Sequence, residues 1–128
     1  LIELISAWAE RQAGIKINFK IEGEFTQVDE VILLTLYRLI QECLTNISRH
    51  AQATSVSILV MKKDETICLK VIDDGKGFCT KTNANGFGLA GMNERVEGLG
   101  GTLDINTKIS QGVRIEVVLP CSVKDIDK

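Results

Sequence analysis

Three polar side chains stand at intervals of four residues in the segment Leu39–Ala51. They are Glu42, Asn46 and His50. In an α-helix this spacing stacks them on one face, above a segment that is otherwise apolar. A carboxylate, an amide and an imidazole on one stripe indicate a functional site. An amphipathic helix whose polar edge happens to hold these residues is the alternative.

A second polar group follows an apolar strand pattern. Asp73 and Asp74 come directly after Ile67–Ile72, and Gly75 and Gly77 follow them. An aspartate at a strand end can accept a hydrogen bond from the exocyclic amine of adenine, whereas guanine has a carbonyl there and would leave the carboxylate unpaired. The glycines would let the backbone approach a flat base. An Asp-Gly turn between strands is the alternative, but the following residues have the composition of a long loop.

The third segment is rich in glycine and reads Gly86-Phe87-Gly88-Leu89-Ala90-Gly91. It matches the G-x-G-x-x-G spacing of dinucleotide-binding proteins, but that motif directly follows a strand, and residues 81–85 have loop composition. We therefore interpret it as a glycine-rich turn that opens a helix, where N–H groups and the helix dipole can hold phosphates. A flexible loop before an ordinary helix start would give the same residues.

In this order and spacing, the three segments make a magnesium–nucleotide site the leading hypothesis. The side-chain carbonyl of Asn46 could bind Mg²⁺ without adding charge beside a triphosphate. Glu42 could hold a metal-bound water or orient the group that attacks the γ-phosphate. Arg49 could reach a phosphate, and His50 could lie flat against a base or ribose.

Hydrophobic periodicity predicts the elements that must bring these segments together. We predict helices over Leu1–Ala13, Gln27–Ala51 and Leu89–Leu99, and strands over Ile15–Ile21, Thr54–Lys62, Thr66–Asp73, Thr102–Lys108 and Gly112–Leu119. Strands outnumber crossovers, which excludes a purely parallel sheet. We expect an α+β fold, a two-layer sandwich with helices on one face of a mixed, mostly antiparallel sheet. Thr54–Lys62 has little polarity on either face and should lie inside the sheet.

The same patterns predict which side chains face the core. In the first strand these are Ile15, Ile17, Phe19 and Ile21, and in the long helix they are Val31, Leu34, Ile40, Cys43, Leu44 and Ile47.

The composition is that of an ordinary globular domain. The chain has 128 residues, of which 45% are hydrophobic and 25% charged, which fits a single domain over residues 1–128. A net charge of −2 argues against a broad nucleic-acid-binding surface. No apolar run reaches the roughly 20 residues that span a bilayer. Because the chain lacks an initiator Met, we expect it to be a fragment of a longer protein, and its four scattered cysteines fit a reduced, cytosolic setting.

Together the three segments resemble the ATP-binding domain of two-component sensor histidine kinases. That domain shares its fold with the ATPase domains of type II topoisomerases, ninety-kilodalton heat-shock chaperones and mismatch-repair proteins. Gln41–Ala51 is similar to the N box, Asp73–Phe78 to the G1 box, and Gly86–Val96 to the G2 box. The G2 form is most similar to that of nitrate and hexose-phosphate sensors, and the resemblance extends from Leu4 to Pro120.

The resemblance implies a protein histidine kinase that binds Mg-ATP and passes the γ-phosphoryl group to a histidine on a separate dimerisation domain. A response regulator would be the next partner, and the chain would be the cytoplasmic part of a membrane-anchored sensor. Glu42 would help to activate the phosphoacceptor, and Asn46 would bind Mg²⁺. The residues that would bind ATP are Asn46, Arg49, His50, Asp73, Gly75, Gly77, Phe78, Gly86, Gly88, Leu89, Gly91 and Met92, and residues 79–87 would form the ATP lid.

Two features depart from the family pattern. Gly112 is followed by Val113, where the family often has a threonine that assists adenine recognition. The phosphoacceptor helices are absent, and the only histidine, His50, occupies an N-box position. Three rival functions stay open: a serine kinase of the anti-sigma-factor type, a non-catalytic ATP-sensing module, and a hydrolytic ATPase like that of the topoisomerases.

Overall fold

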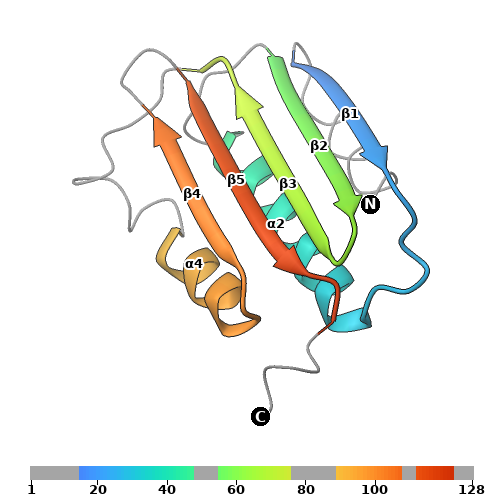
Figure 1. Ribbon diagram of the computed structural model, residues 1–128. Coiled ribbons are helices and arrows are strands. Elements are labelled where there is room, and N and C mark those ends of the chain that lie inside the picture. Colours follow the sequence, from blue (N-terminus) through green and yellow to red (C-terminus); the bar gives the residue numbers. More distant parts are fainter. Residues whose placement is uncertain (1–14, 48–54, 76–88, 108–111, 123–128) are drawn as a thin grey trace.

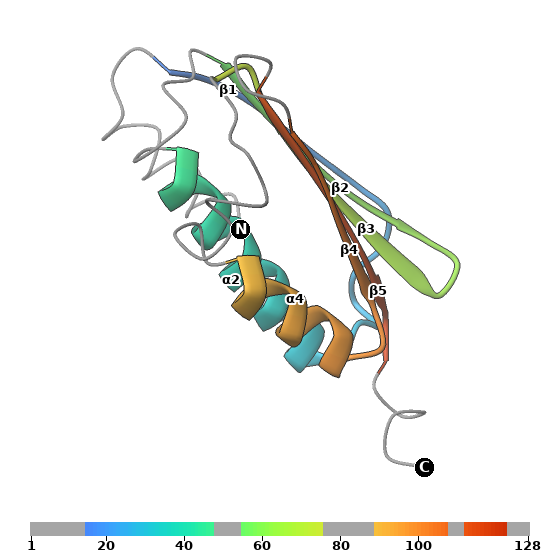
Figure 2. The ribbon, with the colours of Figure 1, turned by 90° about the vertical axis from the view of Figure 1, so that its left-hand side faces the viewer.

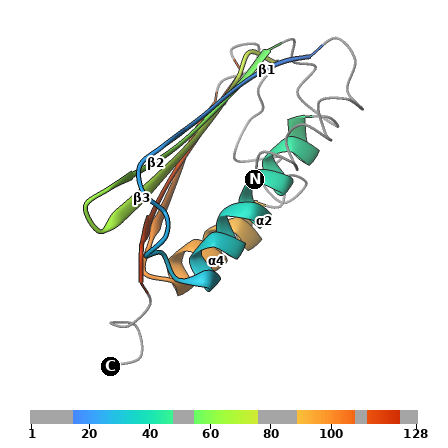
Figure 3. The same ribbon diagram turned by 90° about the vertical axis from the view of Figure 1, so that its right-hand side faces the viewer.

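The computed structural model describes residues 15–47, 55–75, 89–107 and 112–122. Their elements follow in the order β1 (Lys16–Glu22), α2 (Glu30–Asn46), β2 (Ser55–Lys63), β3 (Thr66–Asp73), α4 (Leu89–Gly98), β4 (Thr102–Thr107) and β5 (Val113–Pro120). Both helices cover the same face of one sheet (Figures 1, 2 and 3). This confirms the predicted two-layer α+β sandwich. The helix predicted over Leu1–Ala13 lies outside the described residues.

The sheet has the strand order β1-β2-β3-β5-β4. β1 pairs with β2 in parallel, and the other three pairings are antiparallel. The parallel pair is possible because α2 lies between β1 and β2 in the chain and supplies the crossover that parallel strands need. The predicted mixed, mostly antiparallel sheet is therefore confirmed, as is the interior position of β2.

The core lies between the sheet and the helices. Every second residue of β3 and β5, and of β2 from Val56 to Val60, is buried, because successive side chains of a strand point to opposite faces. From the helices, the core takes Ile32, Leu36, Leu39, Ile40, Cys43 and Leu44 of α2 and Met92 and Val96 of α4. Among the described residues, no helix is both long and apolar enough to cross a bilayer.

α2 begins later than predicted, at Glu30 and not at Gln27. Asp29 has the extended backbone angles φ −59° and ψ 142° that are typical of an N-cap position. Its N–H donates a hydrogen bond of 2.9 Å to the carbonyl of Cys121, at the end of the sheet. The segment before Glu30 is thus held by the sheet and cannot continue the helix.

Three side chains predicted to face the core are exposed instead. Val31 and Leu34 are 42% and 50% exposed, because the run of apolar residues at the start of α2 covers more than the one face that the sheet can bury. Ile21, at 38% exposure, lies near the end of the edge strand β1, which has a neighbour on one side only.

The contrast between two leucines of α2 gives a test of this core. Leu36 is fully buried and Leu34 is half exposed. We expect Leu36→Ala to lower the free energy of unfolding by about 2–5 kcal/mol, since it leaves a cavity. Leu34→Ala, the same change two residues away, should cost less than about 0.5 kcal/mol. Urea unfolding measures both, and equal losses would contradict the orientation of α2.

Candidate functional site

The helix that carries Asn46 and the strand that carries Asp73 both finish on the same side of the molecule. α2 finishes at Asn46 and β3 finishes at Asp73. Figure 1 shows both of these ends at the same edge of the fold, with α2 behind the sheet. The end of β3 that carries Asp73 and the end of α2 that carries Asn46 therefore lie at the same end of the fold, in facing layers.

Asp73 stands where the strand pattern would place another core side chain. In β3 the buried positions are Ile67, Leu69, Val71 and then Asp73, which all point toward the helical layer. Asp73 is only 6% exposed. Of the described residues, only Asp73 and Thr35 are polar and buried, and Asp73 is the only one of the two that can carry a charge.

The backbone of the neighbouring turn holds the Asp73 carboxylate. The N–H of Gly75 donates a hydrogen bond of 2.8 Å to its Oδ1. Burial raises the pKa of Asp73 above its usual value of 3.8, hydrogen bonds from the N–H groups of Gly75 and Val113 act in the opposite direction, and the charge of Asp74 raises it further. A carboxylate oxygen accepts more than one hydrogen bond, so this group can still accept one from a ligand.

Cys43 links α2 to this carboxylate. It lies one turn before Asn46 and its side chain is buried. Burial raises the pKa of the Cys43 thiol to about 12, with smaller contributions from the negative charges of Glu42 and Asp73. α2 packs against β3, and both Cys43 and Asp73 are buried between the sheet and the helices. The thiol itself stays protonated at neutral pH and acts as a small core side chain.

Gly112 has a role that the sequence did not reveal. Its φ is +83°, and a Cβ atom at this position would lie 2.2 Å from the carbonyl oxygen of Asp73. Only glycine fits here, and the close approach lets the N–H of Val113 reach the Asp73 carboxylate. Val113 pairs with Asp73 across the sheet and is buried. The signal for this role in the sequence was a glycine directly before the last predicted strand, Gly112–Leu119.

The structure describes two of the three residues in the polar stripe of α2, Glu42 and Asn46. Glu42 and Asn46 are both half-buried and one helical turn apart, so the structure places them on one face as predicted. Ile47 keeps helical angles of φ −61° and ψ −44°. Arg49 and His50 lie outside the described residues, and their contacts stay predictions.

The G2 segment is described from its helix onward. α4 covers Leu89–Gly98, within the helix that we predicted over Leu89–Leu99. Gly91 is exposed in the first turn, and a Cβ atom there would meet nothing within 4 Å. Met92 is 1% exposed and packs in the core, so its nucleotide contact stays a prediction. Of the other predicted ligands, Gly77, Phe78, Gly86 and Gly88 lie outside the described residues, as do lid residues 79–87.

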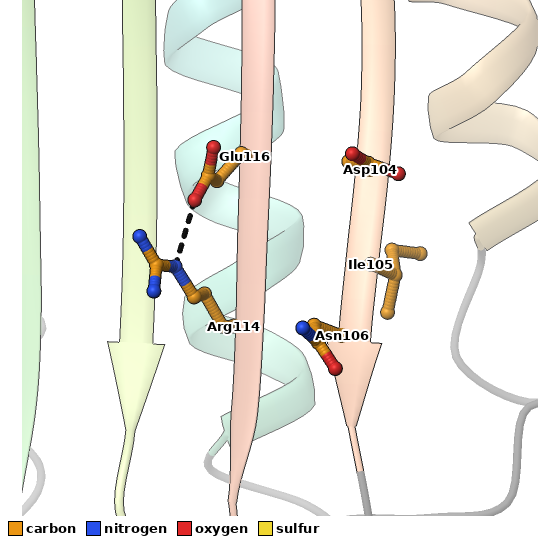
Figure 4. A pocket seen from close by; sticks show the side chains of 5 residues that line it. All are labelled: Asp104, Ile105, Asn106, Arg114 and Glu116. Carbon is orange, nitrogen blue, oxygen red and sulfur yellow. Dashed lines mark ion pairs between the residues drawn. The ribbon is translucent and has the colours of Figure 1, made fainter.

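Two hollows lie away from this site, on the face of the sheet that the helices leave open. One, of about 250 Å³, lies between β4 and β5, and Figure 4 shows its Arg114 and Glu116 in front of the strands, with α2 behind the sheet. Arg114 and Glu116 form an ion pair of 2.7 Å there. The other, of about 670 Å³, extends over β1, β2 and β3. Neither hollow contains a predicted site residue.

The chain is similar to several bacterial kinases. It is 43% identical over 95 residues to the signal transduction histidine-protein kinase/phosphatase UhpB of Salmonella typhimurium, over 74% of this chain and 19% of that protein. It is 35% identical over 117 residues to the kinase/phosphatase DegS of Brevibacillus brevis, over 91% of this chain and 30% of that protein. The chain thus spans about a fifth to a third of the length of these relatives.

A solved structure shares the fold. The blue-light activated histidine kinase of Erythrobacter litoralis superposes with a TM-score of 0.76 at 22% identity, over 96% of this chain and 41% of that one. Residues 32–123, which include α2, Asp73 and α4, match the family described as histidine kinase-, DNA gyrase B- and HSP90-like ATPase. Since that match covers most of the chain, the protein belongs to this ATPase family.

Proposed function

We propose that this chain binds Mg-ATP and donates the γ-phosphoryl group to a histidine on a separate dimerisation and phosphoacceptor domain. Two observations support a kinase within the ATPase family: the relatives UhpB and DegS are named as histidine-protein kinases, and the chain carries the matching family segment. The observation that carries the proposal is the Asp73 carboxylate, which is buried at a strand end beside the last turns of α2.

Asp73 would recognise the base. Its carboxylate accepts the Gly75 N–H at 2.8 Å and has further acceptor capacity for the amine of adenine. Guanine presents an oxygen at that position, so the buried carboxylate would lose its partner and face a second acceptor. A site built in this way should discriminate strongly between the two purines.

Asn46 and Glu42 would act at the phosphates. Among the described residues, no group of three or more acidic, cysteine or histidine side chains could hold a metal ion. Mg²⁺ bound to a nucleotide does not need such a group, because phosphates and water supply most of its ligands and one amide oxygen is enough from the protein. When bound, the ion would neutralise phosphate charge during transfer. Glu42, one turn from Asn46, would orient or deprotonate the attacking group.

The partners follow from the same proposal. The phosphoacceptor helices would come from a separate domain, and a response regulator would receive the phosphoryl group next. The site would work in the cytoplasm, where ATP and the regulator are present. α4, whose first residue is Leu89, would present its N-terminus to the phosphates.

Nucleotide titration tests the proposal directly. We expect the chain to bind ATP with Mg²⁺ at least about tenfold more tightly than GTP, because GTP leaves the Asp73 carboxylate without a donor. Removal of Mg²⁺ with a chelator should weaken ATP binding, and ADP should depend less on the ion. Calorimetry measures each of these affinities. Equal affinity for ATP and GTP would overturn the assignment of Asp73 to adenine.

A further inference from the structure

Asp74, the residue after the proposed base-recognising carboxylate, makes two hydrogen bonds to one residue of the neighbouring strand. Its Oδ1 accepts the N–H of Ser55 at 2.9 Å, and its own N–H donates to the carbonyl of Ser55 at 3.2 Å. The last ladder pair between these strands is Val56 with Asp73. The side chain of Asp74 therefore extends the ladder past the point where β3 ends.

This link fixes the turn that carries the site. On one side the Asp74 backbone is tied to Ser55, and on the other a Cβ at Gly112 would lie within 3.3 Å of the Asp74 Cα. Between these contacts the Gly75 N–H closes onto Asp73. A shift of Asp74 would move the carboxylate of Asp73 and its donor together.

The link also joins two parts of the chain that meet at the site. Ser55 begins the strand that follows α2 in the chain, and Asp74 begins the segment that leads to α4. Side chains that act in recognition must be held within fractions of an ångström by neighbours whose own positions are fixed. Asp74 is exposed and is the residue that supplies this support at the end of β3.

We propose that Asp74 is a positioning residue for adenine recognition, which aims the Asp73 carboxylate by holding the N–H of Ser55. This inference rests on the proposed function, since it requires that Asp73 binds the base. Asp74 itself need not touch the nucleotide. Its loss should therefore act on the choice between purines as well as on affinity.

The test compares Asp74→Ala, which removes the acceptor, with Asp74→Asn, which keeps an oxygen at the same position. ATP and GTP affinities are measured for the 128-residue chain by calorimetry. We expect Asp74→Ala to weaken ATP binding about tenfold and GTP binding much less, so that the preference for ATP falls. Asp74→Asn should bind ATP and GTP with nearly the affinities of the unaltered chain. Asp104→Ala, which removes another exposed aspartate on the open face of the sheet, should change neither.

The ratio of the two affinities separates positioning from simple loss of stability, because partial unfolding weakens both nucleotides equally. An unchanged ratio in Asp74→Ala would overturn the inference. If that variant does not fold at the assay temperature, Ser55→Pro removes the same bond from the donor side, at a strand start that tolerates proline, and decides in its place. If the unaltered chain binds no nucleotide, the proposed function fails. If it binds ATP but the ratio of ATP to GTP affinity is the same in Asp74→Ala, only the role of Asp74 is rejected.

Discussion

Replacing Glu42 by alanine is expected to slow phosphoryl transfer by about 100- to 10,000-fold, while the affinity for ATP changes by less than about threefold. Glu42 lies on α2 one turn before Asn46, and both side chains are half-buried. A carboxylate there can take a proton from, or orient, an attacking imidazole without contacting the base. Transfer from γ-labelled ATP to a supplied histidine-bearing helix pair measures the rate, and calorimetry measures the affinity.

The neighbouring residue gives a matched control. Gln41 is exposed on the adjacent face of α2, so Gln41→Ala changes the helix to a similar extent without touching the stripe. We expect it to transfer at the normal rate. Equal rates for Glu42→Ala and the unaltered chain would remove the catalytic role of Glu42. ATP binding without any phosphoryl transfer by the unaltered chain would instead fit the rival function of a non-catalytic nucleotide sensor.

The strands could be predicted from the sequence because their signals are local. The apolar run Ile67–Ile72 predicted a strand over Thr66–Asp73, and β3 has the same bounds. Asp73 could be singled out for the same reason, since it interrupts an apolar face at a strand end. The family could be inferred because three such segments occur in one order.

What the sequence could not predict depends on tertiary neighbours. Four successive apolar residues follow Glu30 at the start of α2, and only the position of the sheet decides that Ile32 is buried while Val31 and Leu34 are exposed. The contact of Gly112 with Asp73 depends on the register of β3 with β5. The bond between Asp74 and Ser55 depends likewise on the register of β2 with β3, which periodicity alone does not fix.

Asp73→Asn is expected to weaken ATP binding at least about 100-fold, since the amide can turn a donor toward the amine of adenine and loses the charge that strengthens the bond. Its effect on GTP should be smaller, because an amide can donate to the guanine carbonyl. Asp104→Asn makes the same change on the open face and should leave both affinities unaltered. The thermal midpoints should show that Asp73→Asn still folds.

The pH dependence of ATP binding gives a second test of the role of Asp73. Burial, opposed by the N–H groups of Gly75 and Val113, leaves the pKa of Asp73 above 3.8 in the folded chain. ATP affinity should therefore fall as the pH decreases through this raised pKa, because the protonated carboxyl loses acceptor capacity. Calorimetry across acidic pH measures the fall, and Asp73→Asn should lack this part of it.

Stability of the chain without nucleotide should change in the opposite direction. The pKa of Asp73 is higher in the folded chain than its unfolded value near 3.8. The folded state therefore binds the proton more tightly than the unfolded state does. The contribution of Asp73 to the free energy of unfolding is then greatest below pH 3.8 and decreases as the pH rises through the folded pKa. At neutral pH the ionised Asp73 thus lowers the free energy of unfolding, while ATP binding requires its charge. A group that recognises a ligand is expected to show this conflict between stability and function. Urea unfolding of Asp73→Asn against the unaltered chain isolates this contribution, and an identical pH dependence in both would show that Asp73 is not the titrating group.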